Sequence, residues 1–150
     1  MRIWIDADAC PRDVKDVIFR AAQHRQVPVT LVANKAMFSP RSPLISMVVV
    51  PGGPDAADDR IASEALSGDI VITADIPLAA RLVPRAVIVI GTRGEIYDED
   101  TIGERLSVRD FLTEVRDLGG VTGGPAAFSP RDKQRFASTL DQALQRSHRP

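Results

Sequence analysis

The chain has 150 residues, of which 44% are hydrophobic and 26% charged, and its formal net charge at pH 7 is −1. These proportions are typical of a globular protein, and the length favours one domain, residues 1–150. Because no block of like charge occurs, the sequence does not predict a broad nucleic-acid-binding face. The single cysteine, Cys10, excludes an internal disulfide, and neither a membrane-spanning run nor a signal-peptide pattern is found, so we expect a cytoplasmic protein.

The opening residues organise the predicted fold. Residues 2–5 form a nearly continuous apolar run, which is typical of a strand buried on both faces of a parallel sheet. Asp6 ends this run, Asp8 follows two residues later, and Pro11 opens a segment with the apolar period of an amphipathic helix. Since ligands bind at the carboxyl ends of strands in open α/β sheets, the two carboxylates predict a site for a cation or a shared proton.

Further apolar runs alternate with helical patterns along the chain. Strands are expected at residues 29–33, 45–50, 70–75 and 86–90, and helices after Pro11, from Asp55 to Leu66 and from Leu78 to Leu82. This alternation predicts an α/β fold in three layers, in which helices flank a mostly parallel central sheet of about five strands.

The C-terminal part, residues 107–150, is expected to be helical and to pack on the same domain. Ser107 resembles the N-cap of a helix that ends at Gly119, and a final helix is expected to open at Ser129. The glycine-rich stretch at residues 119–125 has two interpretations. Its bare backbone amides approach a phosphate, or it simply links the two helices.

Acidic and amide side chains lie where this topology brings strand ends together. Asp6 and Asp75 end two strands that we expect to be neighbours in the sheet. Asn34 ends another strand, and the helix before the strand of Asp75 begins with Asp58 and Asp59. Carboxylates that crowd together without histidine or cysteine are hard oxygen ligands, which suit Mg²⁺ or Mn²⁺ better than zinc. A divalent ion would also remove the repulsion among them.

A metal ion held by carboxylates suggests phosphoryl chemistry, because it activates water and stabilises a leaving oxygen. Thr73 lies two residues before Asp75, on the same face of the strand. Its hydroxyl either contacts a phosphate oxygen or a metal-bound water, or the residue is an ordinary β-branched strand residue. Cys10 has neither an electropositive setting nor a nearby histidine, so we do not expect it to be a nucleophile.

Six short motifs together resemble those of the YaiI/YqxD family of uncharacterised bacterial proteins. They are Asp6–Pro11, Leu31–Asn34, Asp55–Arg60, Ile72–Ala79, Thr92–Gly94 and Val121–Pro125. That family is similar to PIN-domain and NYN-type nucleases, in which acids at strand ends and on one helix bind Mg²⁺ or Mn²⁺ and cut RNA. The resemblance therefore implies a PIN-like domain, a single-stranded or structured RNA partner, and a homodimer.

If the protein is a metal-dependent ribonuclease, we expect three groups of residues to form its site. The expected metal ligands are Asp6, Asp58, Asp59 and Asp75, supported by Thr73 and Asn34. The expected catalytic residues are Asp6, Asp8 and Asp75, of which Asp8 positions or deprotonates the attacking water. The candidate phosphate contacts are Arg41, Arg60 and Arg93.

Two other functions are compatible with the sequence. A phosphatase of the haloacid-dehalogenase type would use Asp6 as nucleophile and Asp8 as general acid, since the opening strand and its two acids resemble that motif. Cys10 departs from the Thr or Val usual there, and Gly68-Asp69 precedes a strand instead of following one. A non-catalytic module that uses the acids to bind a metal, RNA or a protein agrees with the near-neutral charge.

Overall fold

The structure is a computed structural model of the chain. It describes residues 1–117 and 127–147, with only the backbone described for residues 54, 109–117 and 147. The expected helix end at Gly119 and the glycine-rich stretch at residues 119–125 lie outside the described residues.

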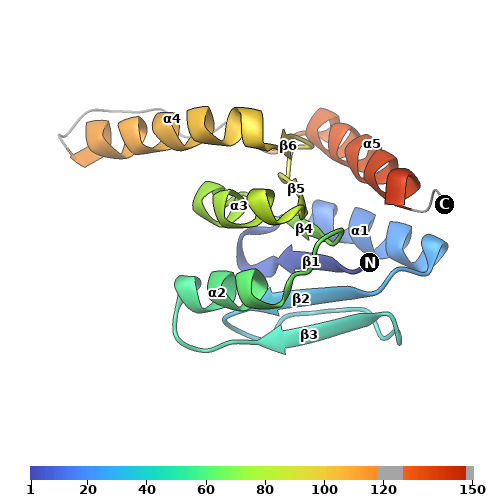
Figure 1. Ribbon diagram of the computed structural model, residues 1–150. Coiled ribbons are helices and arrows are strands. Elements are labelled where there is room, and N and C mark those ends of the chain that lie inside the picture. The colour runs from blue at the N-terminus through green and yellow to red at the C-terminus, as the bar shows by residue number, and fades with distance from the viewer. Residues whose placement is uncertain (118–126, 148–150) are drawn as a thin grey trace.

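The described strands form one sheet, in which helices or loops connect successive parallel strands. The strands are β1 (Ile3–Asp6), β2 (Val29–Ala33), β3 (Ile45–Val49), β4 (Ile70–Ile72), β5 (Ile88–Ile90) and β6 (Ile96–Tyr97). The helices are α1 (Arg12–Arg25), α2 (Pro54–Glu64), α3 (Ile76–Leu82), α4 (Glu99–Asp117) and α5 (Pro130–Ser147), with short 3-10 helices η1 (Ala7–Ala9) and η2 (Val83–Arg85). The order across the sheet is β3-β2-β1-β4-β5-β6, parallel except for the antiparallel pair β5–β6 (Figure 1). The predicted α/β class and mostly parallel sheet are confirmed.

Helices cover both faces of the sheet, which gives three layers. In Figure 1, α2 and α3 lie in front of the sheet and α1 lies behind it. Ile3 and Ile5 of β1 pack with Ile18 of α1 and Phe136 of α5, and all four side chains are fully buried. Trp4 of the same strand packs on the opposite face, with α2 and α3. Successive side chains of β1 thus face different layers, which explains its unbroken apolar run.

The C-terminal helix belongs to the same core as α1. Leu140 and Leu144 of α5 are fully buried in the cluster that contains the α1 side chains. The helix opens as expected near Ser129, whose backbone N–H and hydroxyl both donate to Asp132 Oδ2, at 3.0 and 3.1 Å. The Asp132 N–H donates back to the Ser129 hydroxyl at 3.2 Å. This reciprocal pair is a capping box, which satisfies free N–H groups at the helix start.

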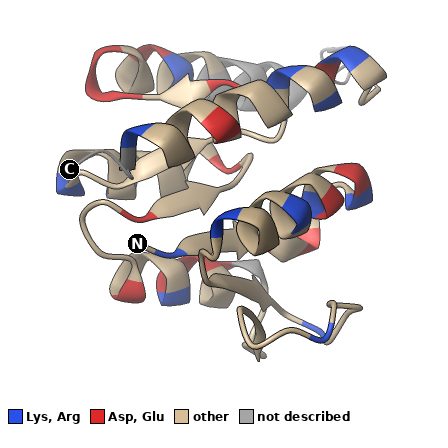
Figure 2. Cartoon of the chain, turned by 90° about the vertical axis from the view of Figure 1, so that its right-hand side faces the viewer, with Lys and Arg blue, Asp and Glu red and all other residues tan. Residues whose placement is uncertain are grey.

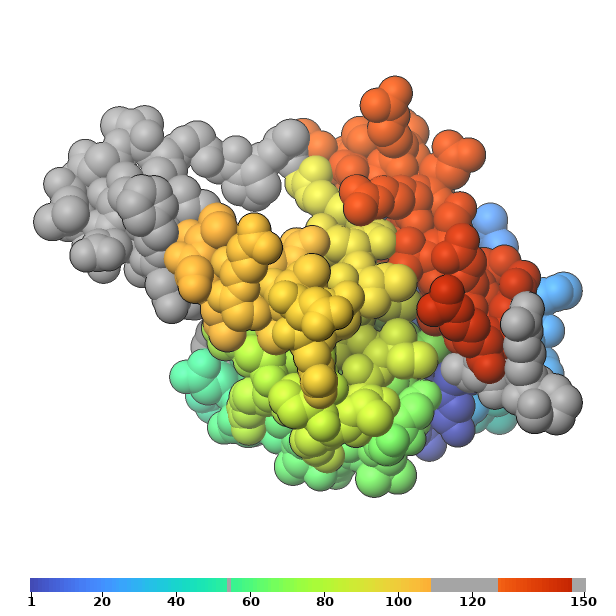
Figure 3. Space-filling view, turned by 45° about the horizontal axis from the view of Figure 1, so that its top comes forward, coloured from blue at the N-terminus to red at the C-terminus, as the bar shows by residue number. Residues whose placement is uncertain are grey.

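A sixth strand, β6, extends the expected five. It has two residues, too few to form a recognisable apolar run, and its position depends on pairing with β5. A tight turn connects the two strands, in which Gly91 N–H donates to Glu95 O at 2.8 Å and Gly94 has a φ of +89°. The space-filling view shows α4 and α5 on either side of this β5–β6 segment (Figure 3).

The helix expected from Ser107 begins earlier, at Glu99. Asp98 precedes it and accepts hydrogen bonds from the Thr101 backbone N–H at 2.9 Å and hydroxyl at 3.0 Å, so Asp98 caps this helix instead. Ser107 lies inside the helix, where its hydroxyl donates to the Gly103 carbonyl at 3.1 Å. The start of this helix could not be predicted from the sequence, because Gly103 lies inside it and its first turns carry no apolar stripe.

Charges of both signs are mixed on the surface, in agreement with the near-neutral net charge. Lys and Arg are interspersed with Asp and Glu on the face that Figure 2 presents. Across the part of the chain that the structure describes, no helix combines the length and the apolar character needed to cross a bilayer.

Candidate functional site

The sheet reverses its strand order at β1, which lies between β2 and β4. In parallel α/β sheets the carboxyl ends of strands at such a reversal leave a crevice that binds ligands. Asp6 ends β1, Asn34 follows β2, and Asp75 lies at the start of α3, shortly after β4. Because β1 and β4 pair in parallel, with Ile5 opposite Ile72, the strands of Asp6 and Asp75 are neighbours as predicted. This edge is on the left in Figure 1, where α2 and α3 begin.

A pocket of about 300 Å³ lies at this edge, and we call it the acidic pocket. Four aspartates, one asparagine and two alanines line it: Asp6, Asp8, Asp58, Asp75, Asn34, Ala9 and Ala74. Lysine, arginine and histidine are absent from this set of described lining residues. The pocket therefore concentrates negative charge and favours a cation.

Thr73 links the carboxylate of Asp6 to the backbone of Asp75. Its hydroxyl donates to Asp6 Oδ2 at 2.8 Å and accepts from the Asp75 backbone N–H at 3.0 Å. Asp75 Oδ1 accepts from the Leu78 backbone N–H at 2.9 Å, which makes Asp75 the N-cap of α3. Thr73 is 1% exposed and Asp6 is 9% exposed. The Thr73 hydroxyl hydrogen is thus committed to Asp6, so Thr73 is a positioning residue.

Asp8 and Asn34 meet at another wall of the acidic pocket. Asp8 lies in η1 and is exposed, and its Oδ2 accepts from the Asn34 backbone N–H at 2.8 Å. The side-chain oxygen Asn34 Oδ1 is buried and has no hydrogen-bond partner among the described residues. A buried oxygen without a donor is unfavourable, and a cation in the pocket would supply the missing partner.

Asp58 enters the acidic pocket from α2, beside Asp75. Burial raises the pKa of Asp58 from 3.8 to about 7. The negative charges of Asp75 and Asp6 add to this rise, as does a hydrogen bond with Asp75. Burial also raises the pKa of Asp6, while the hydrogen bond from Thr73 lowers it. These carboxyl groups therefore resist ionisation, a cost that a divalent cation removes.

The donor atoms fit a hard divalent cation. Four aspartates and one asparagine line the acidic pocket, without a histidine or cysteine among the described lining residues, and oxygen ligands of this kind are those that Mg²⁺ and Mn²⁺ prefer. Within residues 1–117 and 127–147, no three aspartate, glutamate, histidine or cysteine side chains already form an ion-binding group. The carboxylates thus line the acidic pocket without already meeting at one point, and hydrogen bonds hold Asp6 and Asp75 at its wall.

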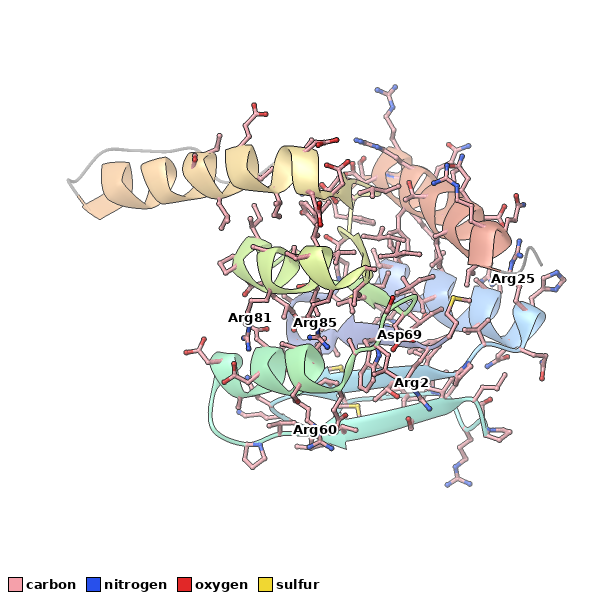
Figure 4. The ribbon with its side chains drawn as sticks, in the orientation of Figure 1. Arg2, Arg25, Arg60, Asp69, Arg81 and Arg85 are labelled. Carbon is pink, nitrogen blue, oxygen red and sulfur yellow. The ribbon has the colours of Figure 1, made fainter. Side chains whose placement is uncertain are left out.

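Asp59 does not reach the acidic pocket. It lies in a neighbouring pocket of about 380 Å³, where its Oδ1 is 2.8 Å from Arg81 Nη1 of α3. Of the two adjacent aspartates that the sequence indicates as metal ligands, Asp58 is the one that lines the acidic pocket. Sequence reasoning missed Arg81, because only the packing of α3 beside α2 brings its guanidinium group to Asp59 (Figure 4).

The three arginines that we expected to contact phosphate lie elsewhere. Arg60 pairs with Glu64 on the surface of α2 at 2.8 Å, and Arg93 pairs with Asp132 at the start of α5 at 3.0 Å. Arg41 is exposed in the loop between β2 and β3. None of the three lines the acidic pocket or its neighbour, and their role in substrate binding stays a prediction.

A second buried aspartate, Asp69, lies at the opposite edge of the sheet. Its carboxylate accepts hydrogen bonds from the Arg2 backbone N–H at 3.0 Å, Trp4 Nε1 at 3.1 Å and the Leu66 backbone N–H at 2.9 Å. Figure 4 shows Arg2 and Asp69 together, away from Arg81. Asp69 therefore stabilises the amino end of β4 and does not supply the later acid of a phosphatase motif.

Cys10 is part of the core. Its side chain is buried with Val14 and other apolar residues behind the sheet. Burial raises the pKa of the thiol to about 12, while the charge of Lys15 lowers it and that of Asp6 raises it. The thiol is protonated at neutral pH and is not an activated nucleophile.

Fold and site together define an α/β domain with an acidic pocket at the reversal of a mostly parallel sheet. The chain belongs to the YaiI/YqxD family, described as an uncharacterized BCR, whose model matches residues 4–146. The resemblance to this family that the six motifs indicate is confirmed.

Its relatives match it from end to end. The chain is 56% identical over 149 residues to a UPF0178 protein of Trichlorobacter lovleyi, which covers 99% of this chain and 97% of that protein. It is 53% identical over 147 residues to a UPF0178 protein of Geobacter sulfurreducens, which covers 97% of each chain. A UPF0178 protein of Bordetella avium is 55% identical over 146 residues, 97% of this chain and 95% of its own. No solved structure gives a significant match.

Proposed function

We propose that the protein is a metal-dependent ribonuclease that hydrolyses phosphodiester bonds of RNA at the acidic pocket. The observation that carries this proposal is the lining of the pocket. Four aspartates line it beside Asn34, whose buried Oδ1 has no donor among the described residues, and no basic side chain of the described lining offsets the carboxylates. Ions held by oxygen ligands of this kind serve phosphoryl transfer. The expected similarity of the YaiI/YqxD family to PIN-like nucleases favours RNA as the substrate.

Asp6, Asp58 and Asp75 are the residues that would hold Mg²⁺ or Mn²⁺, with Asn34 Oδ1 as a further oxygen ligand. When bound, the ion would neutralise the carboxylates and supply Lewis acidity for attack at phosphorus. The Thr73 hydroxyl holds Asp6, and the cap on α3 holds Asp75. Ligands fixed by such outer contacts lose little freedom when they bind an ion.

Asp8 is the residue that we assign to the attacking water. The hydrogen bond from the Asn34 backbone fixes its Oδ2 at the wall of the acidic pocket, and the residue is open to solvent. In the hydrolysis, the water oxygen bonds to phosphorus, the ester oxygen leaves with its electron pair and takes up a proton, and Asp8 accepts a proton from the water.

The test is cleavage of a labelled single-stranded RNA in the presence of Mn²⁺, Mg²⁺ or EDTA. Asp6→Asn and Asp75→Asn remove one charge each and keep an oxygen that accepts from Thr73 or Leu78, so neither contact is lost with the charge. Asp141→Asn, on the exposed face of α5, is the matched control. We expect metal-dependent cleavage by the wild type and the control, and a loss of about 100-fold in the other two variants.

The outcomes separate the alternatives. Cleavage that persists in EDTA, or in both pocket variants, overturns the proposal. A folded protein that binds Mn²⁺ through Asp6 and Asp75 but does not cut RNA is a non-catalytic binding module. A phosphoryl group trapped on Asp6 would identify a phosphatase.

A further inference from the structure

We propose that Arg81 binds a phosphate group of the RNA strand and that Asp59 occupies its guanidinium group until the strand arrives. The inference rests on the proposed function, because it names a further substrate contact of the same site. Its starting point is the relation between the two pockets. Asp58 and Asp75 line both of them, so the pockets adjoin across these two side chains. An RNA strand whose scissile phosphate lies in the acidic pocket can therefore reach Arg81 with a neighbouring phosphate.

Arg81 is the cationic side chain of the second pocket. The described lining otherwise holds four aspartates, a proline and a leucine: Asp55, Asp58, Asp59, Asp75, Pro77 and Leu78. A phosphate that enters this pocket is repelled by the carboxylates and attracted by Arg81 alone among these side chains. The planar guanidinium group can donate two parallel hydrogen bonds to a phosphate, which makes it suited to this contact.

The ion pair that now holds Arg81 is weak enough to exchange. Arg81 and Asp59 are 2.8 Å apart at their closest atoms, and their side chains are 50% and 67% exposed. Exposed ion pairs contribute little to stability, because water solvates both charges when they separate. A phosphate can therefore replace Asp59 without disturbing the helices.

Arg85, a neighbouring arginine, has a structural role that Arg81 does not share. Arg85 of η2 also points toward α2, and its guanidinium group donates to the carbonyl oxygens of Ala62 and Ala65, the latter at 2.7 Å (Figure 4). Those carbonyls lie at the C-terminal end of α2, where helix carbonyls lack internal partners. Arg85 thus fastens α2 to η2, whereas Arg81 contacts an exposed carboxylate that the helix does not need.

The test is equilibrium binding of a fluorescent single-stranded RNA oligonucleotide, measured by anisotropy in Ca²⁺ over a range of salt concentrations, with a gel to show that the RNA stays intact. Arg81→Gln should weaken binding about tenfold, the loss of one charge-assisted contact. It should also reduce the slope of log Kd against log salt by about 0.7, the value for one phosphate on a single strand.

Asp59→Asn should have the opposite effect. It frees Arg81 from its partner, so RNA should bind about threefold more tightly, within the range measured for exposed ion pairs. The double variant should bind like Arg81→Gln, because Asp59 acts only through Arg81. Arg25→Gln is the control for loss of one arginine, since Arg25 also pairs with an aspartate, Asp141, and lies at the other end of the molecule (Figure 4). It should leave Kd and the salt slope unchanged.

Three results overturn the inference: no RNA binding by the wild type, unchanged Kd and slope in Arg81→Gln, or weaker binding in Asp59→Asn. If Arg81→Gln does not fold, the gain or loss of affinity in Asp59→Asn decides the matter. The proposed function fails separately. A wild type that cuts RNA but binds it independently of Arg81 is still a nuclease, and one that binds RNA through Arg81 without cutting it is not.

Discussion

Replacing Asp58 with asparagine is expected to stabilise the metal-free protein above neutral pH. In the folded protein the Asp58 carboxyl keeps its proton up to about pH 7, whereas in the unfolded chain it ionises near pH 3.8. Between these values the folded protein binds more protons than the unfolded chain, so the free energy of unfolding falls as the pH rises, and it stays low above pH 7. Asparagine does not ionise, so the variant keeps the stability that the wild type loses.

The size of the effect follows from the pKa. A tenfold change in an ionisation constant corresponds to about 1.4 kcal/mol, so the rise from 3.8 to about 7 sets a ceiling of about 4 kcal/mol. Solvent around this half-buried carboxyl screens the charges that cause the rise, and we expect roughly 1–2 kcal/mol. For a domain of this length that gain raises the melting temperature by roughly 3–6 °C.

The assay is thermal unfolding, followed by circular dichroism in EDTA at pH 4, 6 and 8. Asp16→Asn, on the exposed side of α1, controls for the loss of one negative charge from the surface. The advantage of Asp58→Asn over the wild type should be absent near pH 4 and grow up to pH 8. A variant that melts below the wild type at pH 8, or differs from it equally at every pH, would refute the argument that burial and neighbouring charges oppose ionisation of Asp58.

Further predictions concern the metal site and the fold. Mn²⁺ should raise the melting temperature of the wild type at pH 8 and barely change that of Asp75→Asn; equal shifts would remove Asp75 from the site. Thr73→Val should lower Mn²⁺ affinity about tenfold in calorimetry, whereas Thr73→Ser should preserve it. Asp69→Ala leaves three N–H donors unpaired and should cost about 2–4 kcal/mol in urea unfolding, with Mn²⁺ affinity unchanged. Gly94→Ala places a Cβ at a φ of +89° and 2.8 Å from the Arg135 backbone, so it should cost about 1–3 kcal/mol; an unchanged urea midpoint would contradict this.

The strands and most helices could be predicted because the spacing of apolar residues along the sequence indicates which side chains are buried. A central parallel strand such as β1 is covered on both faces, so apolar side chains occupy it from Ile3 to Ile5, up to the carboxylate at its end. β6 and the start of α4 could not be predicted in this way. β6 exists because β5 pairs with it, and the Asp98 cap is a single residue without an apolar stripe behind it.

The sequence by itself determined the class of fold and the edge at which the acids gather, since the carboxyl ends of neighbouring parallel strands lie at one edge of the sheet. Asp6 and Asp75 could therefore be placed there in advance. Only the tertiary structure decided that Asp58 enters the acidic pocket while Asp59 meets Arg81. Adjacent residues of a helix point about 100° apart, so the choice between them depends on how α2 is rotated against the sheet and α3, and that rotation is a property of the packed core.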